Sequence, residues 1–113
     1  MDRKNEIIAW LEGEGKLACR STLKAYKSAK KVFENYEAEY IEARDELEEC
    51  LIFNFFGTLP VERRKARTRF NEAKKWLYFA KEELKLAKKQ YVLAQQKLEL
   101  VQRYYKFLYA RNG

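Results

Sequence analysis

The chain has 113 residues, of which 36% are charged and 47% are hydrophobic, with only four glycines and one proline. This balance is typical of long helices or coiled coils and excludes a β-sheet fold or a disordered chain. No apolar run is long enough to predict a membrane span, and the charged N-terminus does not resemble a signal peptide. We therefore expect a cytoplasmic protein without a membrane-embedded part.

Charge is distributed unevenly along the chain. Residues 1–60 carry nine basic and twelve acidic side chains, whereas residues 61–113 carry fifteen basic and five acidic ones. This asymmetry predicts either that the two halves face each other or that the second half faces an anionic partner.

Two breaks divide the chain into three predicted helices. Gly13 and Gly15 are expected to end a short first helix, because glycine weakens a helix interior. The second break is the sequence FFGTLP around Gly57. The predicted helices cover residues 3–12, 16–56 and 59–110. No low-complexity linker separates them, so we predict a single helical domain over residues 1–113.

The second break has the residues of a tight helix–helix turn. Gly57 suits the left-handed position after a helix end, Thr58 can cap the next helix, and Pro60 is tolerated in its first turn. A turn this short requires that the two long helices lie antiparallel.

The last predicted helix carries a heptad repeat in which apolar residues recur with alternating spacings of four and three. We call the large positions "a" and the small positions "d". The repeat consists of Ala66, Phe70, Ala73, Leu77, Ala80, Leu84, Ala87, Tyr91, Ala94, Leu98, Val101, Tyr105 and Leu108.

The middle helix shows the same alternation of large and small residues, with Tyr36 as an exception. Its "a" residues are Cys19, Tyr26, Phe33, Tyr40 and Leu47, and its "d" residues are Thr22, Ala29, Tyr36, Ala43 and Cys50. In an antiparallel pair each bulky "a" side chain faces a small "d" residue, which allows dense packing. One register pairs Leu47 with Ala73 and Tyr40 with Ala80. A register one heptad tighter is equally complementary, so the sequence leaves the register open.

The predicted fold is therefore all-α: an antiparallel coiled-coil helical hairpin with a short N-terminal helix. The last helix has apolar residues that this seam does not use, and they form a second stripe: Trp76, Phe79, Leu86, Leu93, Leu100, Tyr104 and Phe107. We expect the short helix to cover the end of the stripe at Leu100, Tyr104 and Phe107. The uncovered part of the stripe predicts a homodimer that forms a four-helix bundle. The alternatives are that a helix of another protein binds in a groove there, or that the chain is a monomer with the stripe partly exposed.

The clearest polar feature is a run of cations at the start of the last helix. The candidate polyanion-binding residues are Arg63, Arg64, Lys65, Arg67, Arg69, Lys74 and Lys75. A helix N-terminus disfavours positive charge, which suggests a use such as binding phosphate or an acidic protein surface. Nucleic acid or another polyanion is the resulting candidate partner. The alternative is a solvated face partly neutralised by the acidic stretch 34–49, which we expect to lie alongside residues 69–85.

Catalytic and metal-binding patterns are missing from the sequence. The chain has no histidine, which removes the commonest general base and metal ligand. We find no phosphate-binding loop and no zinc-ligand spacing, so we predict neither an enzyme nor a cofactor. Cys19 and Cys50 lie too far apart on one helix to pair, and we expect two buried free thiols.

The turn residues Phe55, Phe56 and Gly57 are similar to the Trp-x-Gly motif of the WXG100 family, with Phe in place of Trp. The resemblance implies a secreted helical hairpin that dimerises. The C-terminal YARNG lacks the acidic residue of that family's export signal, and the basic charge balance departs from the family as well. The residues themselves predict a non-enzymatic protein that acts as a small adaptor, inhibitor or assembly factor, with another protein as its partner. Many compact proteins of this kind come from phages and mobile elements.

Overall fold

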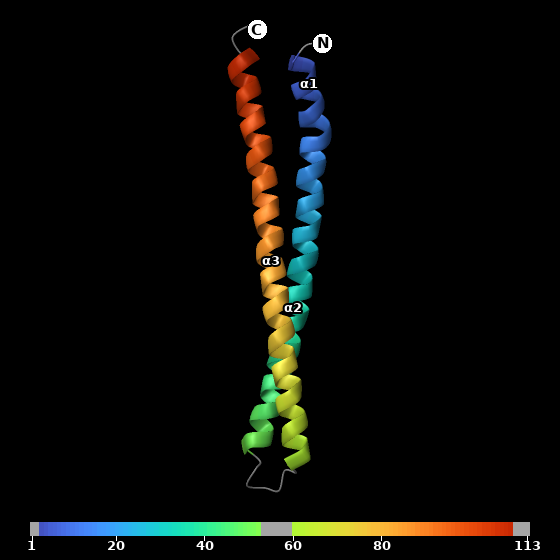
Figure 1. Cartoon of the computed structure of the whole chain (residues 1–113), viewed down its shortest axis with the longest axis vertical. Helices are drawn as coiled ribbons and strands as arrows, with labels where there is room; N and C mark the ends of the chain where they lie inside the picture. Colours follow the sequence, from blue (N-terminus) through green and yellow to red (C-terminus); the bar gives the residue numbers. More distant parts are fainter. Residues whose placement is uncertain (1–2, 53–59, 110–113) are drawn as a thin grey trace. The chain divides into compact units, whose positions relative to one another are not determined.

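The computed structural model describes residues 3–52 and 60–109. Both ranges are helical throughout and contain no strand, which confirms the all-α prediction. The elements are α1 (Arg3–Trp10), the π-helix η1 (Leu11–Gly15), α2 (Lys16–Ile52) and α3 (Pro60–Tyr109) (Figure 1). The predicted turn with its Phe-Phe-Gly motif lies outside the described residues, as do the helix ends predicted at residues 56, 59 and 110.

The chain divides into two compact units, and α2 and α3 each contribute to both. We call residues 1–28 with 85–113 the terminal unit, and residues 29–84 the middle unit. Figure 1 shows α1 and the first part of α2, in blue, beside the orange and red end of α3 in the terminal unit. The single domain predicted from the sequence stays a prediction.

The paired helices run antiparallel in each unit. In the terminal unit, the Lys4 Nζ lies 5.5 Å from the ring centroid of Tyr109, near the end of α3. Later in α2, the Tyr26 ring lies 6.1 Å from that of Tyr91. In the middle unit, the rings of Tyr40 and Phe70 are 5.4 Å apart. The antiparallel hairpin arrangement expected from the heptads is therefore present in both units.

The predicted heptad residues form the seam between the helices. All thirteen "a" and "d" residues of α3 are buried or half-buried, as are the ten of α2. The buried hydrophobic residues in the described ranges are all alanines: Ala43, Ala66, Ala73 and Ala80. Because these side chains are so small, the bulky residues of the facing helix can fill the space beside them.

Contacts in both units follow the tighter of the two registers that the sequence leaves open. Gly15 lies against the Leu98 side chain in the terminal unit. In the middle unit, Arg69 pairs with Glu46. This register places Leu47 opposite Ala66 and Tyr40 opposite Ala73, so large residues still meet small ones.

The prediction that Gly13 and Gly15 end the first helix is wrong. The chain continues from α1 through the single π-turn η1 into α2. Gly15 is buried, and a Cβ atom there would lie 2.8 Å from Trp10 Cζ3 and 2.9 Å from Leu98 Cδ1. Gly15 is seven residues before Thr22, so it belongs to the small "d" series of α2. The missing side chain at Gly15 leaves room for the Trp10 and Leu98 side chains, and the helix continues through this residue.

Candidate interaction surfaces

The structure leaves exposed the large apolar residues that the sequence assigned to a second stripe. In the terminal unit we call four of them, one per heptad of α3, the leucine stripe: Leu86, Leu93, Leu100 and Phe107, which are 57%, 54%, 64% and 73% exposed. Tyr104 beside them is also half exposed. The seam formed with α1 and α2 in this unit therefore does not use the stripe.

The predicted covering of this stripe by the short helix is wrong. In the terminal unit α1 extends the seam, because Ile7, Ile8, Trp10 and Leu11 are half-buried while Leu100, Tyr104 and Phe107 stay exposed. Trp10 holds α1 in the seam, since its ring packs against Gly15. The Lys97 Nζ lies 5.4 Å from the centroid of that ring, which is within the range of a cation–π contact.

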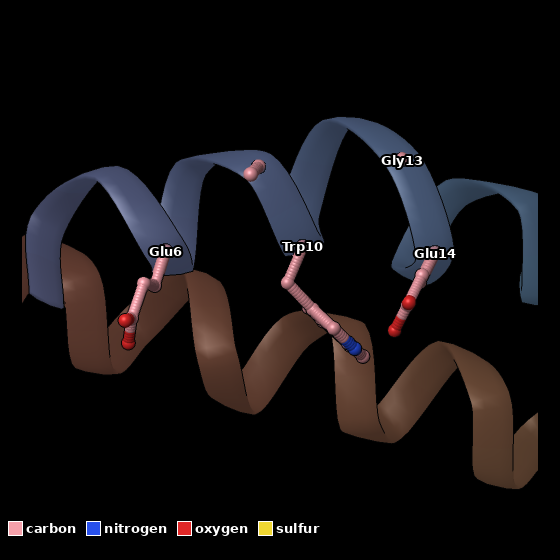
Figure 2. A pocket seen from close by; sticks show the side chains of 5 residues that line it. Glu6, Trp10, Gly13 and Glu14 are labelled. Atoms are coloured by element: carbon pink, nitrogen blue, oxygen red, sulfur yellow. The ribbon is translucent and has the colours of Figure 1, made fainter.

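Trp10 also forms part of a shallow hollow on α1 and η1. Figure 2 shows Glu6 and Glu14 on either side of Trp10, whose side chain points toward α3. Ala9 and Gly13 complete the lining. Because Lys97 already lies over a face of the Trp10 ring, we interpret this hollow as a by-product of the packing between Trp10 and α3 and not as a binding site.

The middle unit carries a separate group of aromatic rings, the aromatic patch, formed by the half-buried Tyr36 and the exposed Trp76, Tyr78 and Phe79. Tyr36 and Trp76 stack with 6.4 Å between ring centroids and 17° between ring planes. Phe79 contacts Trp76 at 6.2 Å and Tyr78 at 5.9 Å. The stacking explains why Tyr36 departs from the small "d" series, because its ring extends across α3 to Trp76.

The patch surrounds a small hollow in the middle unit. Val32, Tyr36, Trp76, Phe79, Ala80 and Glu83 line the hollow. Trp76 is 51% exposed and Phe79 is 46% exposed. Aromatic rings that stack on each other and remain half exposed form a rigid apolar surface, of a kind enriched at protein interfaces.

The cations at the start of α3 do not form one continuous surface. Arg69 pairs with Glu46 and also with Glu42 at 3.5 Å, as expected for the acidic stretch of α2. The hydrogen bond and the charge of Glu46, with a smaller contribution from Glu42, raise the pKa of the Arg69 guanidinium. A base whose pKa is raised stays charged up to a higher pH, so the Arg69 guanidinium is charged at neutral pH.

Three of the remaining arginines share a hollow on the first turns of α3. Arg63, Arg64 and Arg67 line it together with Pro60. Arg63 occupies an "a" position, is half-buried, and has a buried Nε atom without a hydrogen-bond partner among the described residues. Lys65, Lys74 and Lys75 are exposed elsewhere on the same helix. The structure thus brings Arg63, Arg64 and Arg67 together and directs Arg69 to α2.

Sequence reasoning missed Trp10 and Gly15 as partners across the seam. Counting seven residues back from Thr22 would have identified Gly15 as a seam position. The contact between Lys97 and Trp10 had no comparable signal, because the π-turn displaces the residues before it from the heptad frame.

Comparison with protein-family models, with curated proteins and with solved structures finds no match to this chain. In residues 3–52 and 60–109, no helix has the length and apolar character that crossing a membrane requires. The same residues contain no group of three or more Cys, Asp or Glu side chains arranged to hold a metal ion. Cys19 and Cys50 are free and half-buried.

Proposed function

We propose that this chain is a non-enzymatic binding protein that presents the leucine stripe of α3 to another protein. A single observation carries the proposal: four large apolar side chains, spaced one heptad apart, stay more than half exposed beside a filled seam. Single exposed leucines are ordinary, but a regular row of them is typical of a docking face. The partner surface would be helical, since a heptad spacing matches the ridges of another helix.

Energetics favour covering this face. Full burial of a leucine or phenylalanine side chain contributes about 1.5–3 kcal/mol, so burying the exposed half of each stripe residue contributes about 1 kcal/mol. A small adaptor, inhibitor or assembly factor would act by this kind of contact, because it requires no catalytic group.

Replacing Leu86 and Leu93 together by glutamate is expected to abolish binding through the stripe. Charged side chains cannot be buried at an apolar interface without a large desolvation cost. The matched control is Gln95→Glu with Gln102→Glu, which adds the same charge at two exposed polar positions of α3, also seven residues apart and away from the stripe. The readouts are sedimentation equilibrium for self-association and crosslinking in cell extract for other partners.

The L86E/L93E variant should stay helical by circular dichroism and lose every crosslink that the control keeps. If it keeps both its solution mass and its crosslinks, the proposed function is wrong.

A second candidate function, polyanion binding, is favoured by the hollow that Arg63, Arg64 and Arg67 share. Guanidinium groups are suited to phosphate because they donate paired hydrogen bonds. If this hollow binds nucleic acid, log K should fall with log salt by about 0.9 per phosphate contact. Fluorescence anisotropy with DNA and RNA, on the native chain and on R64Q/R67Q, measures this. Absence of binding at low salt excludes the candidate.

A further inference from the structure

We infer that the occupant of the leucine stripe is a second copy of this chain, docked antiparallel with its two-fold axis near Gln90. The inference rests on the proposed function, because it names the partner of the same surface.

The polar residues between the leucines carry this inference. On α3, which is one continuous helix, the stripe alternates with Glu83, Gln90 and Lys97, and all three are exposed. Glu83 and Lys97 lie at equal distances along the sequence on either side of the neutral Gln90. The row is therefore acidic at one end and basic at the other.

Reversing one copy makes this row complementary to itself. A two-fold axis near Gln90 brings Glu83 within one turn of Lys97 of the partner subunit, and Leu86 within one turn of the partner's Leu93. By symmetry each contact occurs twice, as a two-fold interface between identical chains requires. A parallel pair would instead place Glu83 against the partner's Glu83 and Lys97 against the partner's Lys97, and like charges in contact disfavour binding.

The neighbouring face of α2 leaves room for such a second hairpin. In the terminal unit α2 exposes small residues along the side that heptad geometry places next to the stripe: Ala18, Ser21, Ala25 and Ser28. Small side chains there let another helix approach closely enough for its leucines to be covered.

Charge reversal tests the pairing of Glu83 with the partner's Lys97. Glu83→Lys and Lys97→Glu should each raise the dimer dissociation constant by roughly five- to thirtyfold, since each creates two repulsive contacts. The double variant E83K/K97E should return to within about threefold of the native constant, because it restores both pairs with reversed sign. Sedimentation equilibrium across the micromolar range measures all four proteins.

Lys97 also contacts the Trp10 ring within its own chain, so Lys97→Glu has a second effect. Glu83→Lys lacks that effect and must weaken the dimer by itself. Helicity by circular dichroism shows whether each variant still folds.

Thiol crosslinking tests the orientation. Cys19 and Cys50 are first replaced by alanine, and a Leu86→Cys chain is then mixed with a Leu93→Cys chain. An antiparallel dimer about Gln90 crosslinks the mixture, because Leu86 then lies within one turn of the partner's Leu93, whereas identical positions lie about 9–12 Å apart along the helix at a rise of 1.5 Å per residue. A parallel dimer crosslinks each protein with itself.

The inference is overturned if the native chain is monomeric, if E83K/K97E does not recover, or if identical positions crosslink. If the chain is monomeric but L86E/L93E still loses crosslinks that its control keeps, the proposed function stands with a different protein as the occupant. If L86E/L93E changes nothing, the proposed function fails as well.

Discussion

Replacing Ala43 by leucine is expected to lower the free energy of unfolding by about 1–3 kcal/mol. Ala43 is 0% exposed, and the register places it opposite Phe70 in the middle unit. The extra methyl groups have no free space, so they must displace the neighbouring side chains or separate the helices. Urea denaturation followed by circular dichroism measures the change.

The control for this substitution lies on the same helix and in the same unit. Ala38 is exposed, so Ala38→Leu should change the free energy of unfolding by no more than about 0.5 kcal/mol. The alternation of large and small seam residues predicts in addition that the double variant Ala43→Phe with Phe70→Ala loses less free energy of unfolding than the two single variants lose together. If Ala43→Leu is as neutral as Ala38→Leu, the packing described for the seam is wrong.

The two glycines near the start of the chain should respond in opposite directions to alanine. Gly15→Ala places a Cβ atom 2.8 Å from the Trp10 ring and 2.9 Å from Leu98, and we expect it to destabilise the fold by about 1–3 kcal/mol. Gly13→Ala meets nothing within 4 Å and should stabilise the fold by about 0.5–1 kcal/mol, because alanine favours the helix.

The pair forms an internal control, since both substitutions add one methyl group to the same turn. Thermal and urea unfolding of the two variants measure the difference, with hydrogen exchange of α1 amides as a local readout. Equal stabilisation by both substitutions would show that Trp10 and Leu98 move aside freely, and that the crowding around Gly15 has no energetic weight.

The seam could be predicted from the sequence because the residues that a helix buries against a single partner helix recur with one regular spacing, alternately three and four residues apart. A residue on the wrong side of α3 cannot contact α2, so the apolar spacing from Ala66 to Leu108 was sufficient to identify the face. Register was harder, because the large and small residues repeat every seven positions and a shift of one heptad preserves every match. Contacts such as Arg69 with Glu46 were needed to distinguish the two.

The N-terminal region could not be predicted in the same way. Glycine weakens a helix in isolation, and this general rule led to a break at Gly13 and Gly15. In the folded chain the absence of a side chain at Gly15 is what lets Trp10 and Leu98 pack, so tertiary packing overrides the local preference. For the same reason α1 continues the seam and leaves Leu100 and Phe107 exposed.

The alternation of large and small residues has a consequence for how the helices find their alignment during folding. A strictly periodic pattern does not by itself define the alignment of the two helices. If one helix slides by seven residues, every large side chain still faces a small one, and only the contacts at the helix ends are lost. Alignment must come from features that occur once. The missing side chain at Gly15 in the terminal unit and the Tyr36–Trp76 stack in the middle unit have no counterpart a heptad away. Slippage is therefore resisted by the few residues that have no equivalent one heptad away.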